Sequence, residues 1–129
     1  MTGPLDFGIV GAGAIAQAYS QAFSGFAAAR VAAVADPRAE AAAALAEQLG
    51  GAAFAGHREM LERARLDAVL VCTPPASHAE IGLDCLERRV AVLCEKPLAL
   101  DAGAARCMVA AAERAGVALT MASKFRYVE

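Results

Sequence analysis

Two continuous apolar runs constrain the fold of this chain more than any other feature. Residues 67–72 read DAVLVC and residues 90–94 read VAVLC, and polar residues do not alternate with apolar ones within either run. A strand that is apolar on both faces needs cover on both sides, which is typical of a parallel sheet between two layers of helices. The sequence therefore predicts a central sheet with helices above and below it.

The rest of the chain alternates between strand and helix as such a sheet requires. The predicted strands are residues 5–10, 31–35, 52–55, 67–72, 90–94 and 117–121. The predicted helices are residues 14–26, 38–49, 57–64, 77–88 and 101–115. Because strand-to-strand crossovers are right-handed, this order predicts an α/β fold: a doubly wound parallel sheet with strand order 3-2-1-4-5-6 and three αβα layers. We expect residues 1–129 to form one dinucleotide-binding domain of this Rossmann type.

Two helix starts carry capping signals. Ser77 is followed by Glu80 in the order S-H-A-E, which fits a capping box. Asp101 precedes the Ala-rich helix that runs up to Gly116, and its side chain is a suitable N-cap. Both signals favour the predicted helix boundaries.

A glycine-rich turn follows the first strand and begins the first helix. Residues 11–16 read GAGAIA, the G-x-G-x-x-A form of the dinucleotide fingerprint. Gly11 permits the tight turn, and Gly13 has no side chain that would keep a pyrophosphate from the backbone. The amides near Ala14 and Ile15, at the positive end of a helix dipole, would then point at the pyrophosphate. The alternative is a glycine turn with a structural role only.

Asp36 ends the second strand, at the separation from the glycines that the fingerprint requires. Its carboxylate can accept hydrogen bonds from the adenosine ribose hydroxyls, or it can cap the helix that begins near Pro37. A carboxylate there would repel a 2′-phosphate, so NAD is favoured over NADP. Arg38 tempers this preference, because its guanidinium could pair with such a phosphate.

Two further segments follow buried strands. Thr73, Pro74 and His78 lie in the TPPASH segment after the fourth strand, beside the expected switch point of the sheet. His78 would lie either beside the crevice or exposed at the start of a helix. Glu95 and Lys96 follow the fifth strand in the segment Glu-Lys-Pro, at the same sheet edge as the glycine turn. There an ammonium could hydrogen-bond a substrate oxygen and stabilise a developing alkoxide. The alternative for this pair is a solvated surface turn.

Taken together, these motifs resemble the Gfo/Idh/MocA family of NAD(P)-dependent oxidoreductases. The matching segments are GAGAIA at 11–16, AD at 35–36, TPPASH at 73–78, EKP at 95–97 and KFRY at 124–127. The resemblance implies that Lys96 is the active-site lysine, that Glu95 lies by the nicotinamide ribose, and that the Lys96–Pro97 bond can be cis. It also implies that Thr73, Pro74 and His78 contact the cofactor.

The resemblance further implies a second, mostly β domain that forms the substrate pocket and that these 129 residues do not contain. We therefore expect an NAD(P)-binding domain of an oxidoreductase that transfers hydride to or from a sugar, cyclitol or similar polyol, and that is inactive alone. One alternative is an NAD(H)-binding sensor or partner-docked subunit without catalysis. Another is a methyltransferase-like domain, which would have no need of Lys96.

Composition excludes several other classes. The net charge of −2 offers no basic face for nucleic acid, and no apolar run is long enough to cross a bilayer. None of the four cysteines is paired at two-residue spacing with another, so we expect no metal site and interpret these residues as reduced. Because the N-terminus has no signal peptide, we expect a cytoplasmic protein. Without a second domain over the last strand, apolar surface would be exposed, so we also expect that the chain can form a homo-oligomer.

Overall fold

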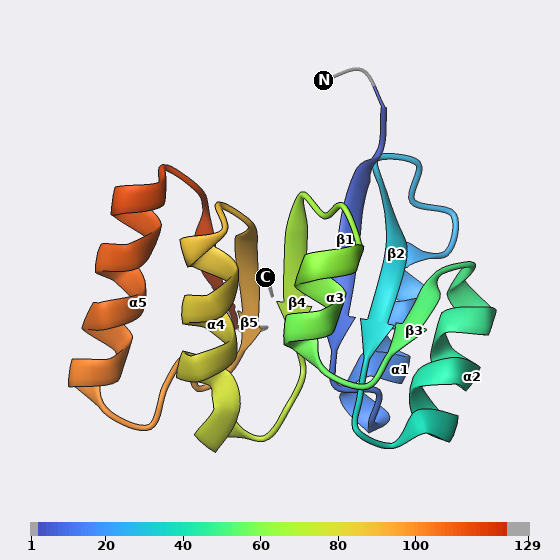
Figure 1. The fold of residues 1–129 in the computed structure, drawn as a ribbon, viewed down its shortest axis with the longest axis horizontal. Helices are drawn as coiled ribbons and strands as arrows, with labels where there is room; N and C mark the ends of the chain where they lie inside the picture. The colour runs from blue at the N-terminus through green and yellow to red at the C-terminus, as the bar shows by residue number, and fades with distance from the viewer. Residues whose placement is uncertain (1–2, 124–129) are drawn as a thin grey trace, which may run out of the picture.

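The computed structural model describes residues 3–123 and shows a three-layer α/β sandwich around a six-stranded sheet (Figure 1). All neighbouring strands are parallel, and the order β3-β2-β1-β4-β5-β6 confirms the predicted topology. The strands are β1 (Leu5–Val10), β2 (Ala29–Ala35), β3 (Ala52–Phe54), β4 (Ala68–Val71), β5 (Ala91–Glu95) and β6 (Leu119–Ala122).

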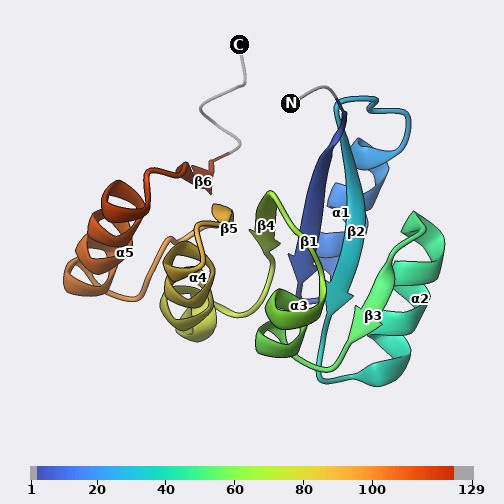
Figure 2. The ribbon, with the colours of Figure 1, turned by 45° about the horizontal axis from the view of Figure 1, so that its top comes forward.

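Helices cover both faces of the sheet, as the apolar strands require. The helices are α1 (Ala14–Phe23), α2 (Ala39–Leu49), α3 (His57–Arg63), α4 (His78–Glu87) and α5 (Ala102–Ala115), with a short 3₁₀ turn, η1 (Pro75–Ser77), before α4. Figure 2 shows α1 and α2 behind the sheet and α3, α4 and α5 in front of it. Within the described residues, no helix is both long and apolar enough to span a membrane.

The core has two halves, one on each side of the sheet. Ile9 and Leu70 are fully buried on the side of α1 and α2, whereas Val69 and Val71 are fully buried on the side of α4 and α5. Every residue of β4 is buried, which explains why its sequence lacks alternation. The expectation of burial on both faces is therefore confirmed for β4. It is wrong for β5, where Val92 and Cys94 are buried on the side of α4 and α5 but the alternate residues are only half-buried.

The strand register brings the carboxyl ends of the central strands to one edge. Val10 pairs with Ala35 and with Val71, and Val71 pairs with Cys94. The loops that follow β1, β2, β4 and β5 therefore leave the sheet side by side. This is the edge where the sequence places its candidate functional residues.

The helix starts agree with the sequence only in part. The Asp101 carboxylate accepts a hydrogen bond from the Ala104 amide at 2.8 Å, so the predicted N-cap is confirmed. The capping box at Ser77 is wrong: no side chain caps α4, and the Ser77 hydroxyl instead donates to the preceding loop. The first helix ends at Phe23, earlier than expected.

Candidate functional site

The glycine turn between β1 and α1 is shaped by backbone contacts that exclude a side chain. Gly11 has a φ of +96°, and a Cβ atom there would lie 2.8 Å from the carbonyl carbon and oxygen of Cys72. At Gly13 an added Cβ would meet only the Arg38 guanidinium, at 3.9 Å. Gly13 is also the N-cap of α1 and supplies no side-chain hydrogen bond to the first turn. Gly11 thus has a structural role, whereas the space beside Gly13 is open to a ligand.

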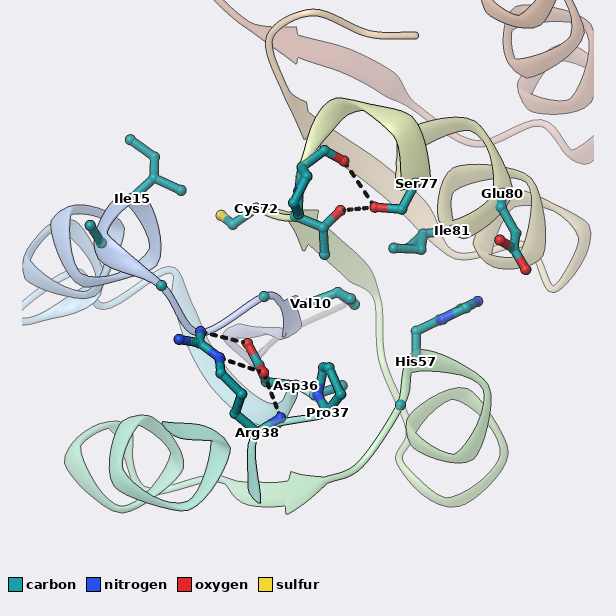
Figure 3. A pocket seen from close by; sticks show the side chains of 17 residues that line it. Val10, Ile15, Asp36, Pro37, Arg38, His57, Cys72, Ser77, Glu80 and Ile81 are labelled. Atoms are coloured by element: carbon teal, nitrogen blue, oxygen red, sulfur yellow. Dashed lines mark hydrogen bonds and ion pairs between the residues drawn. The ribbon is translucent and has the colours of Figure 1, made fainter. Parts of the chain in front are cut away.

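Asp36, directly after β2, connects the glycine turn to the next loop, and Figure 3 shows its carboxylate beside the Arg38 guanidinium. One carboxylate oxygen accepts the Ala12 amide at 2.8 Å, and the other accepts the Arg38 amide at 2.8 Å. The Arg38 guanidinium approaches the same carboxylate with two N–H groups, each at 3.1 Å. Asp36 is buried whereas the Arg38 side chain is exposed, so the carboxylate is fixed and the guanidinium is free on its outer side.

These contacts set the charge of Asp36. Desolvation by burial alone would raise the pKa of its carboxyl, but the hydrogen bonds from the Arg38 side chain and from the Ala12 and Arg38 amides outweigh it. The net effect lowers the pKa below the ordinary aspartate value. Asp36 is therefore an anionic acceptor at neutral pH, as ribose recognition requires.

A cavity of about 650 Å³ joins these segments at the carboxyl edge of the sheet. The predicted residues that line it are Gly11, Gly13, Ala14, Ile15, Asp36, Arg38, Thr73 and Pro74. Other lining residues that the sequence analysis did not assign to the site include Gly56, His57, Cys72, Ser77, Glu80 and Ile81. Figure 3 shows these side chains around a shared space between the glycine turn, β2 and α4.

The loop after β4 is held by its own side chains. The Ser77 hydroxyl lies 2.7 Å from the Thr73 hydroxyl and 2.9 Å from the Pro74 carbonyl. The Ser77 hydroxyl is therefore bonded within the loop and does not cap α4, as the capping box would have required. This hydrogen-bonded loop forms one wall of the cavity, which Thr73 and Pro74 line.

His78 lies behind this wall. It is 1% exposed, so the expectation of an exposed helix-start residue is wrong. Its two ring nitrogens each lie 2.7 Å from a backbone carbonyl, those of Pro97 and Thr73. His78 is not among the residues that line the cavity, and its ring connects two loops. The sequence placed it beside the crevice but did not predict its burial.

Lys96 lies in a second hollow, of about 1030 Å³, on the side of the sheet where α1 lies. The hollow is lined by Ile15 and Tyr19 of α1, by Leu93, Glu95, Lys96 and Pro97, and by residues 120–123. Ile15 lines both hollows, so the two adjoin at the start of α1. The Lys96–Pro97 peptide bond is cis, as the resemblance implied.

Glu95 has a partner that the sequence did not predict. The Tyr19 hydroxyl donates to its carboxylate at 2.6 Å, across 76 positions in the sequence. Burial raises the pKa of Tyr19, and the bond to Glu95 raises it further, so the hydroxyl keeps its proton and remains a donor. No local pattern links a tyrosine in the first helix to a strand end this far along the chain.

Comparison with known proteins agrees with this geometry. Residues 5–123 match the model of an oxidoreductase family with an NAD-binding Rossmann fold, Gfo/Idh/MocA. The chain belongs to this family. As a Gfo/Idh/MocA member it is an NAD-binding oxidoreductase domain, and the predicted cofactor, NAD, is confirmed at this level.

Two Gfo/Idh/MocA relatives illustrate the match. The chain is 41% identical over 83 residues to an inositol 2-dehydrogenase from Rubrobacter xylanophilus, covering 64% of this chain and 24% of that protein. It is 33% identical over 121 residues to a glucose-6-phosphate 3-dehydrogenase from Bacillus subtilis, covering 94% of this chain and 34% of that protein. The chain thus spans about a third or less of these relatives.

A solved Gfo/Idh/MocA structure has the same fold. The WlbA dehydrogenase from Bordetella pertussis, crystallised with NADH and UDP-GlcNAcA, superposes with a TM-score of 0.94 at 26% identity. The match covers 98% of this chain and 37% of WlbA. The expected KFRY match at residues 124–127 lies outside the described residues.

Proposed function

We propose that this chain binds NAD across its first cavity and presents Lys96 to the hydroxyl of a sugar, cyclitol or similar polyol. The observation that carries the proposal is the junction of the two hollows at Ile15. A dinucleotide along the first hollow would extend its nicotinamide end toward the second, where Lys96 lies. When bound, NAD would accept or supply the hydride.

The residues around the first hollow fit a dinucleotide. The open space at Gly13 is the space that a side chain would fill, and a pyrophosphate there would meet the amides of Ala14 and Ile15 at the start of α1. Asp36 would accept the adenosine ribose hydroxyls, and Arg38 would lie over the adenine end. Thr73 and Pro74 would contact the middle of the cofactor. These assignments favour NAD, with NADP less suitable because Asp36 is anionic.

Lys96 and Glu95 would act at the other end. The Lys96 ammonium would donate a hydrogen bond to the substrate oxygen, hold that oxygen beside the hydride position and stabilise the alkoxide that develops there. Glu95, oriented by Tyr19, would lie near the nicotinamide ribose. An ammonium cannot accept the proton that an alcohol loses, so turnover needs a separate proton acceptor, and we propose that a further domain supplies it together with the substrate pocket. The chain alone is then inactive.

A non-catalytic NAD(H)-binding subunit, docked on a partner, is the second candidate. It is favoured by the hollow beside Lys96, whose strand residues Thr120 and Met121 are exposed in this chain. That face would suit a docked domain or a second copy of the chain.

All four thiols are free, which suits a reducing compartment, so a cytoplasmic location is part of the proposal.

Titration of the chain with NADH, followed by fluorescence or calorimetry, tests the proposal. We expect saturable binding that the Lys96→Ala variant retains, because the ammonium acts on substrate. Arg106→Ala, which removes an exposed cation from α5, is the matched control. Absence of NADH binding would refute both candidates.

Hydride transfer to NAD from a panel of polyols separates the two candidates. Under the proposal, a longer protein that contains this chain turns over and loses that activity with Lys96→Ala. Turnover that is unaffected by Lys96→Ala would remove Lys96 from the mechanism. Full turnover by the 129 residues alone would contradict the need for a second domain.

A further inference from the structure

The imidazole of His78 joins the two loops that form the site. Nδ1 lies 2.7 Å from the carbonyl oxygen of Pro97, and Nε2 lies 2.7 Å from the carbonyl oxygen of Thr73. Pro97 follows Lys96 directly, and Thr73 lines the first cavity. One buried ring therefore spans from the cofactor wall to the lysine loop.

The chemistry of the two partners fixes how many protons this ring needs. A backbone carbonyl oxygen only accepts hydrogen bonds, so each contact requires an N–H on the histidine. Neutral imidazole has one N–H, and its second nitrogen would face a carbonyl lone pair with no proton between them. Only the doubly protonated ring satisfies both contacts.

Both contacts lie within hydrogen-bond distance, so each ring nitrogen is close enough to its carbonyl oxygen to require a proton between them. Burying a charge costs free energy, and in the doubly protonated ring hydrogen bonds from both N–H groups to carbonyl oxygens would offset part of that cost.

We propose that His78 is a proton-dependent clamp, which in its imidazolium form fixes the Thr73 loop and the Lys96 loop relative to each other. Its role in placing Lys96 beside the nicotinamide rests on the proposed function above, whereas the clamp itself does not. His78 is a positioning residue, because it acts through the two loops and does not line the cofactor cavity.

Other titratable groups on the segments around His78 would not account for such a pH dependence. Burial raises the pKa of the Cys72 thiol to about 12 and that of Cys94 to about 11, so both stay neutral through the range in which a histidine titrates. Glu95 is held by Tyr19, and Glu80, on the first turn of α4, is paired with Arg58. Lys96 remains the neighbouring cation on the clamped loop.

Raising the pH should therefore open the clamp. The folded form uses the proton on each ring nitrogen, so the clamp is complete on the acidic side and loses one contact as His78 deprotonates. Either the Thr73 loop or the Lys96 loop is then released from the ring. NADH affinity would fall in step with that release.

Nitrogen NMR of the histidine rings in the ¹⁵N-labelled chain tests the clamp directly. The sequence has two histidines, so a His57→Gln variant leaves the signals of His78 alone. We expect both ring nitrogens of His78 to carry protons in mildly acidic solution, and the amide signals of the two loops to shift together with the ring as the pH is raised to mildly alkaline. A neutral ring with one protonated nitrogen over that whole range would overturn the proposal.

The second readout is NADH affinity as a function of pH. His78→Gln places its amide donors at one end of the side chain and cannot reach both carbonyls, so we expect binding about tenfold weaker than wild type and insensitive to pH over the histidine range. Retention of the wild-type pH profile in this variant would refute the coupling of the clamp to binding. If the wild-type chain binds no NADH, the proposed function fails, and the NMR experiment still decides the clamp.

Discussion

Replacing Gly11 or Gly13 by alanine should separate the structural and ligand-binding roles of the glycine turn. At Gly11 an alanine would keep a φ of +96° and place its Cβ 2.8 Å from the backbone carbonyl of Cys72. The strained backbone costs about 1–3 kcal/mol and the overlap with rigid backbone about 1–3 kcal/mol. Gly11→Ala should therefore lose about 2–6 kcal/mol of unfolding free energy, or on the order of 10 °C in melting temperature.

At Gly13 the same methyl group has room. Its φ is −88°, which alanine adopts freely, and the nearest atom to the added Cβ is 3.9 Å away. We expect Gly13→Ala to change the unfolding free energy by less than about 1 kcal/mol. The methyl group would nevertheless fill the space proposed for the pyrophosphate, so NADH affinity should fall at least about tenfold, roughly 1.4 kcal/mol.

Urea unfolding and NADH titration of both variants make the comparison. Wild-type NADH affinity in Gly13→Ala would refute the placement of the pyrophosphate. A fully stable Gly11→Ala would show that the turn does not require the backbone conformation described here. Gly50→Ala, at a positive-φ position with open space, controls for backbone strain without overlap.

Three further perturbations test the site. The pKa of Asp36 is lower in the folded than in the unfolded chain, so its stabilising contribution is present above the unfolded value of about 3.9 and is lost as the pH falls through the folded value. The difference in unfolding free energy between wild type and Asp36→Asn should therefore close below about pH 4. A difference that persists in acid would contradict this. Tyr19→Phe should lose about 1 kcal/mol in urea unfolding, and the loss should vanish in a Glu95→Ala background. Iodoacetamide at pH 8 should modify Cys107 alone, because it is exposed whereas burial suppresses the thiolate of the other three cysteines; mass spectrometry showing an adduct on the Cys107→Ser variant would refute this.

The sheet was predictable because its determinants are local. The apolar runs of β4 and β5, the glycine turn and the Asp101 cap each act within a few residues, and the structure has each of them at the expected position, although β5 is fully buried on one face only. The strand order followed from general rules of chain crossover. Sequence alone was therefore sufficient to bring the candidate residues to one sheet edge.

What the sequence could not indicate depends on contacts between distant segments. The Ser77 hydroxyl could bond to an amide of the following helix or to Thr73 in the preceding loop, and in the structure it bonds to Thr73. His78 could face the crevice or the interior, and the carbonyl of Pro97, from another strand end, holds it inside. The Tyr19–Glu95 bond likewise needs the register of the whole sheet.

The carboxylate of Asp36 has no acceptor position to spare. It already receives N–H groups from Ala12 and from the Arg38 amide, Nε and Nη2, and a carboxylate offers about four lone-pair sites. An arriving hydroxyl must therefore displace a donor, and the exposed guanidinium yields more easily than the buried amide. A ribose bound to Asp36 would then leave the Arg38 guanidinium unpaired at the rim of the site, where it could bind a 2′-phosphate. Selectivity between NAD and NADP would therefore depend on whether Arg38 stays paired with Asp36 or turns toward the ligand.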